Sequence, residues 1–541
     1  MSVPTVLSNS TRYLSAGAYI DAEFRDAVID ELLGDRHRAV APSHGRTDAR
    51  TVLMHCLRAR RVTVARDAVI SLLLLLGLGL DFGITAGLLI SMVPLALLSR
   101  RSVQANTVLR VFMIVWAALV VLGLILQVMA LLAFQALTSA FAVGAPAAAL
   151  GVVRPGYVML MFALLTAIAY WVFQYIQLST TFDFGRPHTT PQESVPAQRD
   201  WYIDQAQWGN LALYGGEDPF VGSGETHQTW SIVVELDRKP PTPGAAAGER
   251  RNATIDPADL HAFIRERLEQ MRTGVLNERE SIARLTVSDH LTAPGTLHRG
   301  GGGHPLLGPD GMPRFTLDPA SIDAVKRNPQ GAMRYYQRVT VGAEGPPIVT
   351  DSGTLVVPSS DRETDISAYI HLAVEGRMMY TQCLIMALPP CRRSFHVIDV
   401  LPALSPIAVV GKALAALRLR LFEEVLFAPV RLVRSVFEQN RQQRPDRFLA
   451  YPYGARASVR ELGAEREPTS FMQVLDIDKY SKLISQRLNE AVLDYLEAHD
   501  IDTTSYRQQA IVNYGAWVSG GTVNGPIAAG HQAQATQQGA S

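Results

Sequence analysis

The chain has 541 residues, 48% of them hydrophobic, and its 50 Lys and Arg residues balance 50 Asp and Glu residues, so its formal net charge at pH 7 is zero. This balance excludes the basic character expected of a nucleic-acid-binding protein, and we expect no nucleic-acid partner. Three cysteines are too few for a disulfide framework and favour a reducing compartment for the soluble parts.

Residues 1–66 are predicted to form an N-terminal cytoplasmic segment of amphipathic helix. Within Ala22–Asp35, apolar side chains recur at helical spacing on one face, namely Phe24, Val28, Ile29, Leu32 and Leu33. A second helical stretch starts at Arg50 and carries a basic cluster before the first apolar run, namely Arg58, Arg60, Arg61 and Arg66. Such a cluster either binds anionic lipid or only sets the orientation of the first span.

Residues 67–178 are predicted to form a transmembrane domain. The runs Val111–Phe134 and Tyr157–Leu178 each exceed the ~20 apolar residues that cross a bilayer core. The block Val69–Leu98 fits either one tilted span or a short hairpin that turns at Leu80–Gly83. The hairpin keeps the basic residues on both sides of the block in the cytoplasm. We therefore expect about four crossings of a bacterial inner membrane, with both termini cytoplasmic.

Three further features of this domain carry expectations. Asp81 is a candidate member of a proton or ion path if it lies at mid-depth, whereas at a hairpin turn it lies near the interface. Tyr170, Trp171 and Tyr175 are expected to anchor the last span at the interface. The small-residue stretch Gln135–Arg154 is expected to be a loop or a re-entrant segment.

Residues 179–207 form a predicted linker, and residues 208–507 are predicted to form a cytoplasmic α+β domain. Strands are expected at Thr229–Leu236, Tyr335–Val341 and Gly353–Pro358, with a hairpin of Ile366–Glu375 and Arg377–Pro390 at the centre of the sheet. Helices are expected at Asp256–Arg272, Ala408–Gln443 (kinked at Pro429) and Asp478–His499. The helix Ala408–Gln443 fits either the inner leaflet or packing on the sheet or on a partner subunit.

The glycine turn Gly222–Gly224 resembles a phosphate cradle. It lacks both the Lys-Ser/Thr continuation and a complete G-x-G-x-x-G pattern, so we expect it to be only a turn. Glu217, Asp218 and Glu225 are the acidic residues beside it, and nothing in the sequence pairs them.

Cysteine and histidine residues give only incomplete metal-site patterns. Cys383 and Cys391 could form half of a site, but no second Cys or His pair stands at ligand spacing. His298 and His304 flank glycines in the loop Leu297–Pro313, where disorder is the alternative to a metal or active-site loop. His371 and Cys383 are expected to pack within strands. We assign no catalytic, cofactor-binding or metal-binding residue and expect no cofactor.

Residues 508–541 form a tail without Asp, Glu, Lys or Arg, in which short apolar pairs alternate with Gly, Asn and Gln. This composition fits a self-assembling β motif, a disordered tail or a small hairpin docked on the body.

The segments SAGAYIDAEFRDAVIDELLGDRHRAVAPSHG, HCLRARR, PFVGSGE and NYGAWVSGGTVNGPIAAG together resemble uncharacterised multi-pass membrane proteins of actinobacteria. That resemblance implies no activity. The tail alone is similar to amyloid signalling motifs attached to some bacterial defence proteins, which implies self-association.

These patterns predict an α-helical membrane domain joined to a cytoplasmic α+β domain. The function that we expect is a non-enzymatic anchor, scaffold or assembly protein, with the lipid bilayer, an unknown protein and a second copy of the chain as partners. One alternative is a defence or stress effector that permeabilises the bilayer when the tails associate. The other is a membrane-bound enzyme with a dispersed site, although no nucleophile elbow, Walker loop or H-E-x-x-H motif is present.

Overall fold

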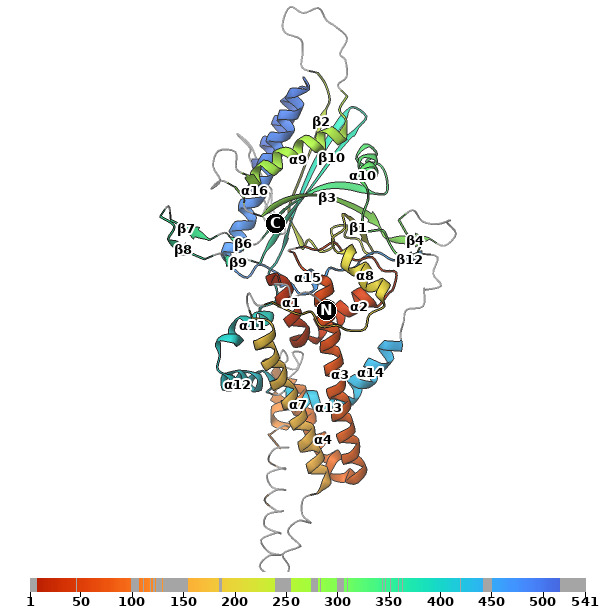
Figure 1. The fold of residues 1–541 in the computed structure, drawn as a ribbon, viewed down its shortest axis with the longest axis vertical. Coiled ribbons are helices and arrows are strands. Elements are labelled where there is room, and N and C mark those ends of the chain that lie inside the picture. Colours follow the sequence, from red (N-terminus) through yellow and green to blue (C-terminus); the bar gives the residue numbers. More distant parts are fainter. Residues whose placement is uncertain are drawn as a thin grey trace, which may run out of the picture. The chain divides into compact units, whose positions relative to one another are not determined.

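A computed structural model describes residues 7–98, parts of 107–129, and 154–238, 254–273, 281–298, 306–440 and 450–515, with breaks of one to three residues inside these ranges (Figure 1). These residues divide into two compact units. The helical unit includes His55–Pro191 and Val397–Gln443, and the α+β unit includes Leu7–Met54, Gln192–His396 and Arg444–Ser541.

The two units divide the chain differently from the predicted domains. We expected residues 208–507 to form one continuous domain, but Val397–Gln443 belongs to the helical unit, because its helices pack on α4 (Phe82–Leu98) and α7 (Pro155–Thr181). Residues 7–54 of the predicted N-terminal segment belong to the α+β unit. The predicted linker 179–207 contains the end of α7 and all of helix α8 (Ala197–Ala206).

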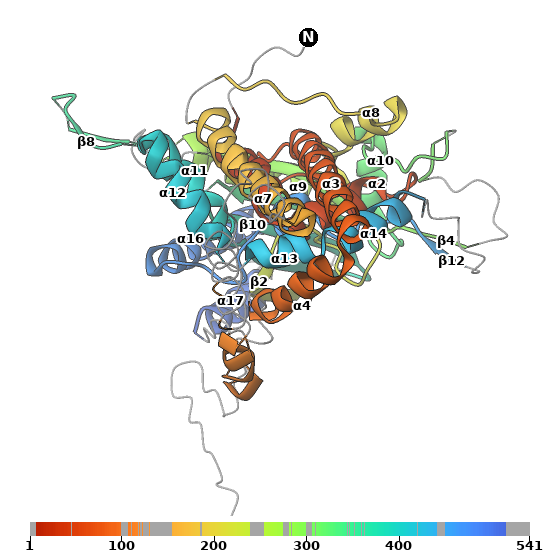
Figure 2. The same cartoon turned by 90° about the horizontal axis from the view of Figure 1, so that it is seen from below.

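The helical unit is built on α3 (Ala49–Leu80), α4 and α7, which Figure 2 shows beside α13 (Arg420–Leu426). The chain breaks between α3 and α4 at Asp81, whose backbone C=O accepts a hydrogen bond from Thr85 N at 3.1 Å. Ile70 and Leu74 of α3 share a buried cluster with Met92 of α4, so the two helices fold back on each other at Asp81. The side chain of Asp81 lies 3.8 Å from that of Arg154.

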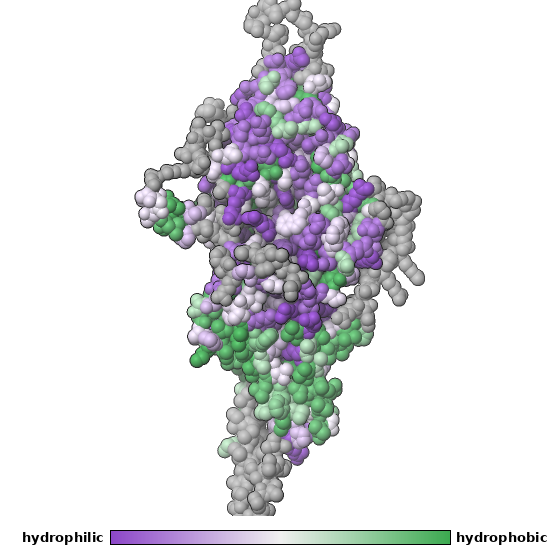
Figure 3. Space-filling view, viewed as in Figure 1, coloured by the Kyte–Doolittle hydropathy of each residue, from purple (hydrophilic) through white to green (hydrophobic). Residues whose placement is uncertain are grey.

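Large apolar side chains cover the outside of the helical unit, as the green atoms of Figure 3 show. α3 and α7 are long and apolar enough to cross a membrane by length and composition. Only 33% and 28% of their most apolar windows are buried inside the protein, whereas a core helix of a soluble protein is mostly buried. The predicted aromatic anchors differ from expectation: Trp171 and Tyr175 are buried against protein.

The predicted single helix Ala408–Gln443 is three helices, α12 (Pro406–Leu417), α13 and α14 (Ala428–Asn440). They follow the short helices α11 (Val397–Val400) and η4 (Leu401–Ala403). Arg418 has a positive φ of 30° and ends α12. The kink predicted at Pro429 is wrong, because this proline occupies the first turn of α14, where its missing N–H costs no hydrogen bond.

The α+β unit contains a mixed six-stranded sheet of order β1-β3-β5-β10-β11-β2, in which only β1 and β3 pair in parallel. Its strands are β1 (Leu211–Tyr214), β2 (Glu225–Glu235), β3 (Leu285–Pro294), β5 (Arg334–Val341), β10 (Asp365–Glu375) and β11 (Met378–Leu388). The predicted hairpin β10–β11 is confirmed, with Glu375 opposite Met378 across a turn at Gly376, which has φ +52°. Strands β1 and β3 were not among the predicted strands.

Two layers cover the sheet. On one face, α9 (Pro257–Thr273), α16 (Phe471–Ala498) and α17 (Thr504–Gly515) pack on a cluster that includes Ile370 and Cys383. Figure 1 shows α9 and α16 beside the sheet. The other face carries aromatic and polar side chains such as Tyr369, which contact Phe220 and residues of the N-terminal segment. Because both faces are covered, the first nine residues of β10 are buried or nearly buried.

Smaller elements complete the α+β unit. They are α1 (Asn9–Ile20), α2 (Ala22–Leu33), α10 (Pro319–Arg327), η3 (Arg393–His396), α15 (Val459–Leu462) and three two-stranded ribbons, β12–β4 (Ala450–Pro452, Thr296–His298), β6–β9 (Glu344–Gly345, Ser360–Asp361) and β7–β8 (Ile348–Val349, Leu355–Val357). The predicted apolar face of α2 is confirmed for Phe24, Val28, Ile29 and Leu32, which are buried. The predicted strand Gly353–Pro358 is β8, and it lies outside the six-stranded sheet.

Several predicted features lie outside the described residues. They are most of the span Val111–Phe134, the segment Gln135–Arg154 up to Val153, the glycine run with His304, and the tail after Gly515. The first eight residues of the predicted tail, 508–515, are instead the end of helix α17.

Candidate functional site

Four charged side chains form an ion cluster in the helical unit, where helix α3 enters its apolar run. They are Arg66 and Asp67 of α3, Glu424 of α13 and Arg431 of α14. Arg66 Nη2 lies 2.7 Å from Asp67 Oδ1 and 2.8 Å from Glu424 Oε2. Arg431 donates from Nε to Asp67 Oδ2 at 2.9 Å and from Nη2 to Asp67 Oδ1 at 3.0 Å.

The two inner members of this cluster are almost fully buried. The side chains of Arg66 and Asp67 are 5% and 3% exposed, and the guanidinium of Arg66 also stacks over the ring of Tyr170 at 4.4 Å. The Tyr170 hydroxyl in turn shares a hydrogen bond with Thr63 Oγ1 at 2.8 Å. Arg66 was predicted to belong to a lipid-facing or orienting basic cluster, but its charge is committed to protein partners.

The ion cluster is electrically balanced, with two guanidinium groups and two carboxylates. A buried charge is tolerated only when it is paired and hydrogen-bonded, so each member depends on the other three. Burial lowers the pKa of Arg431, but its hydrogen bond to Asp67 and the nearby carboxylates hold that pKa above its usual value. The cluster therefore fixes α13 and α14 against α3 through paired side chains.

A second polar cluster, the His44 network, lies on the aromatic face of the sheet in the α+β unit. It consists of His44, Ser223, Arg338 and Tyr369. The glycine turn positions Ser223, whose Oγ lies 2.5 Å from the Tyr369 hydroxyl oxygen and 3.2 Å from His44 Nε2. Gly222 and Gly224 have φ of +96° and +82°, which explains the two glycines.

The His44 imidazole has a defined tautomer in this network. Its Nδ1 lies 3.0 Å from the carbonyl oxygen of Pro42, so Nδ1 carries the proton and Nε2 accepts. Arg338 Nη1 donates to Nε2 at 3.3 Å. Burial and the positive charge of Arg338 lower the pKa of His44 to about 3, so the ring is neutral near pH 7.

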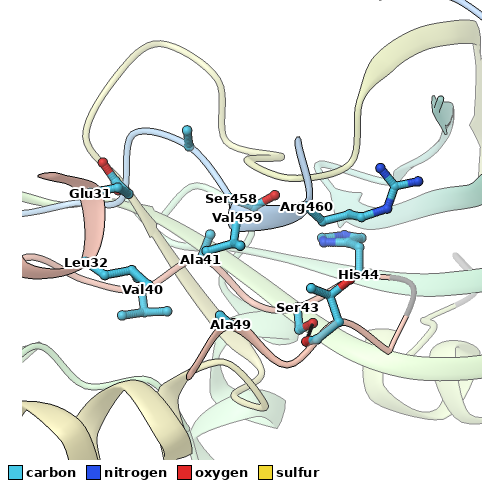
Figure 4. A pocket seen from close by; sticks show the side chains of 12 residues that line it. Glu31, Leu32, Val40, Ala41, Ser43, His44, Ala49, Ser458, Val459 and Arg460 are labelled. Carbon is cyan, nitrogen blue, oxygen red and sulfur yellow. Dashed lines mark hydrogen bonds between the residues drawn. The ribbon is translucent and has the colours of Figure 1, made fainter. Parts of the chain in front are cut away.

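A serine beside a neutral histidine is a possible nucleophile pair, but this one is closed to a substrate. His44, Ser223 and Tyr369 are 3%, 1% and 0% exposed. The adjoining pocket, lined by Ser43, His44, Ser458 and Arg460 among others, has a volume of about 10 Å³, which is room for about one water molecule (Figure 4). The His44 network therefore fastens the N-terminal segment to the sheet.

The glycine turn does not offer a free phosphate cradle either. Gly222 N donates to Glu461 Oε2 at 3.1 Å, so a carboxylate already occupies the position that a phosphate would need. Of the acidic residues beside the turn, Asp218 caps Phe220 N at 2.8 Å, and the structure brings no pair of Glu217, Asp218 and Glu225 together as partners.

A third feature is a cleft of about 250 Å³ in the α+β unit, lined by Glu363, Pro390, Cys391, Arg393, His396, Thr469 and Gln473. His396 Nε2 lies 3.1 Å from Glu363 Oε2, and its ring stacks on Tyr13 with centroids 4.2 Å apart. The cleft is large enough for a small ligand, but Glu363 and His396 already contact each other, and the Arg393 side chain donates to the Thr469 carbonyl oxygen.

The remaining predicted residues lie in packed strands or loops. Cys383 is fully buried in β11, and burial raises the pKa of its thiol to about 12. His371 is buried in β10, with Nδ1 2.9 Å from the carbonyl oxygen of Tyr335, which confirms the packed-strand prediction. Cys391 is also buried. Among the residues that the structure describes, no three His, Cys, Asp or Glu side chains gather as metal ligands.

Sequence reasoning missed both polar clusters. Asp67 and Arg431 are separated by 364 positions and His44 and Tyr369 by 325, so no local pattern links them. The available signal was an acidic residue, Asp67, standing directly before an apolar run, where an unpaired charge is costly.

Removing one charge from the ion cluster is expected to destabilise the helical unit. Asp67→Asn leaves two guanidinium groups facing one carboxylate. Removing one partner of a buried ion pair costs about 3–5 kcal/mol of stability. We expect a clearly lower thermal unfolding temperature of the detergent-purified chain, and the double variant Asp67→Asn/Arg431→Gln should lose less than the sum of the single losses. Asp494→Asn, in an exposed pair with Arg267, serves as the control and should change little. Additive effects would argue against a coupled cluster.

The His44 network is expected to make the fold sensitive to acid. The pKa of His44 is lower in the folded chain than in the unfolded chain. The contribution of neutral His44 to the free energy of unfolding is therefore complete above about pH 6.5 and is lost as the pH falls toward 3. Between pH 7 and pH 5 this loss amounts to ~2 kcal/mol. His44→Asn should remove that part of the pH dependence in denaturant unfolding. Ser223→Ala removes a hydrogen bond without a titrating group and should destabilise equally at both pH values; an unchanged slope in His44→Asn would contradict the assignment.

Comparison with known proteins gives one family. The model of the AbeC-like domain matches residues 229–525, which is more than half of the chain. The comparisons with curated proteins and with solved structures gave no match. The match begins within strand β2 and runs through helices α12, α13 and α14 to beyond α17. The chain belongs to the family of proteins that contain an AbeC-like domain.

Proposed function

We propose that this protein is a multi-pass integral membrane protein whose helical unit lies in the bilayer and whose α+β unit binds a protein partner. The apolar surface of the helical unit is the observation that carries the proposal. Leu75 of α3, Phe82 of α4 and Phe173 of α7 are 66%, 71% and 56% exposed. A contiguous apolar surface of this kind is rare on soluble monomers and typical of a lipid-facing one.

The route of the chain supports an even number of crossings. Residues 7–54 and 192–396 belong to the same compact unit, so the intervening chain must leave and return on one side of the bilayer. A helical hairpin of α3 and α4, one span in Val111–Phe134 and a return through α7 make four. A single span formed by α3 and α4 together would make three and would place two parts of one compact unit on opposite sides.

Exposed apolar groups also support a binding role for the α+β unit. The β7–β8 ribbon exposes all five of its apolar side chains, Ile348, Val349, Leu355, Val356 and Val357. Helix α16 exposes Phe471 and Met472. Such groups outside the helical unit mark contact surfaces for a partner. A non-enzymatic anchor or assembly role agrees with the closed His44 network.

Membrane insertion is expected to depend on the apolar surface of α3. The wild-type chain should remain in the membrane pellet after alkaline carbonate extraction. Leu72→Arg/Leu75→Arg places two charges on lipid-facing positions, at about 2.5–3.5 kcal/mol each near a helix centre, and should release a large fraction. Phe471→Arg/Leu475→Arg, at exposed positions of α16, is the matched control and should stay in the pellet. Extraction of the wild-type chain would refute membrane insertion.

The topology is expected to show four crossings with the α+β unit in the cytoplasm. Reporter fusions after Arg101, Pro191 and Ser541 should report cytoplasm, and a fusion after Pro146 should report the outside. The basic residues flanking α3 and α4 give the reason, since they favour the cytoplasmic side. If the fusions after Pro191 and Ser541 report the outside, α3 and α4 act as one span and the proposed orientation fails.

A further inference from the structure

The segment Val397–Gln443 has an unusual route, since it leaves the α+β unit for the helical unit and then returns. Its three main helices, α12, α13 and α14, have 12, 7 and 13 residues. At 1.5 Å per residue the longest is ~20 Å, which is too short for a bilayer core of ~30 Å. The segment therefore does not cross a membrane and returns on the side from which it came.

Helix α14 has apolar side chains that point outward, whereas a surface helix of a soluble protein buries its apolar side chains. Its apolar residues Val430, Val433 and Phe437, at i, i+3 and i+7, are 61%, 54% and 69% exposed. Arg431 faces the protein, where it joins the ion cluster with Asp67. A soluble helix buries its apolar stripe, so the outward stripe of α14 requires an apolar surrounding.

Helix α12 adds a second outward apolar face. Val409, Ala413 and Leu417 are buried at i, i+4 and i+8, on the side that packs on α7. Ile407 and Leu414 on the other side are 86% and 45% exposed. Both helices therefore leave large apolar side chains exposed on the side away from their protein contacts.

The charges of the segment favour lipid as the occupant of these faces. Between residues 397 and 443, Lys and Arg number six and Asp and Glu number four, which leaves an excess of two positive charges. Lys412 and Arg418 are exposed on and directly after α12, close in sequence to its apolar side chains. Apolar side chains bordered by basic ones are typical of helices that lie in the headgroup region of an anionic membrane.

We propose that Val397–Gln443 is a membrane-interface element, in which α12 and α14 lie along one leaflet with their outward apolar side chains among the lipid chains. The inference rests on the proposed membrane insertion of α3 and α7 and goes beyond it. The AbeC-like match covers this segment but ends short of those two helices, since it begins at residue 229. The matched domain thus carries a membrane-binding segment of its own.

Site-specific fluorescence quenching tests this inference on the full chain in vesicles of equal parts phosphatidylcholine and phosphatidylglycerol. Bimane is attached at single introduced cysteines, Ile407→Cys, Val433→Cys and Phe437→Cys, and the native chain is the blank because its three thiols are buried. Quenchers are lipids brominated along the chain and aqueous iodide. Leu75→Cys on α3 reports a bilayer position, and Phe471→Cys on α16 reports a position in water.

We expect labels at Ile407, Val433 and Phe437 to be quenched several-fold more by brominated lipid than by iodide, as at Leu75, with the reverse at Phe471. If the three labels behave like Phe471 while Leu75 is quenched by lipid, the interface element is refuted and membrane insertion stands. Protection from both quenchers would indicate a contact with a second copy and would also refute it. Iodide quenching at Leu75 would refute membrane insertion and, with it, the interface element.

Discussion

The exposed apolar surface of the helical unit is the constraint on which the rest of the structure depends. Fully burying one large aliphatic side chain is worth about 1.5–3 kcal/mol, and α3, α4 and α7 leave many of them outside the protein. In water these exposed side chains would contribute nothing to folding, whereas lipid would remove them from water. The helix hairpin, the break at Asp81 and the inner contacts between Ile70, Leu74 and Met92 then need only specify packing between helices.

An apolar surrounding raises the cost of every charge placed within it. Asp67 stands two residues before Val69, the first residue of the long apolar run, and it is acceptable there because Arg66 and Arg431 both pair with it. Glu424 then balances the second guanidinium. Because a partly satisfied cluster is worse than an apolar contact, these four charges specify one position of α14 on α3. In this way the ion cluster also determines which face of α14 points outward.

Local sequence patterns predicted the elements whose environment is uniform along their length. The apolar runs of α3 and α7 and the β10–β11 hairpin are examples. The helix predicted at Asp478–His499 begins earlier, at Phe471, where Ser470 and Gln473 form a capping box. Pro429 could not be placed from the sequence, because a proline fits both a kink and a helix start. The His44 network and the ion cluster depend on side chains brought together from distant segments, which local periodicity does not encode.

The AbeC-like match and the fold together show that the matched residues do not complete their own sheet. β10 and β5 supply Tyr369 and Arg338, but His44 and Ser223 of the same network precede residue 229, as does the edge strand β1. Without them the aromatic face of the sheet would present buried polar groups to water or leave them unpaired. The chain between His44 and Ser223 passes through the helical unit, so the α+β fold is complete only once both ends of that passage have met on the sheet.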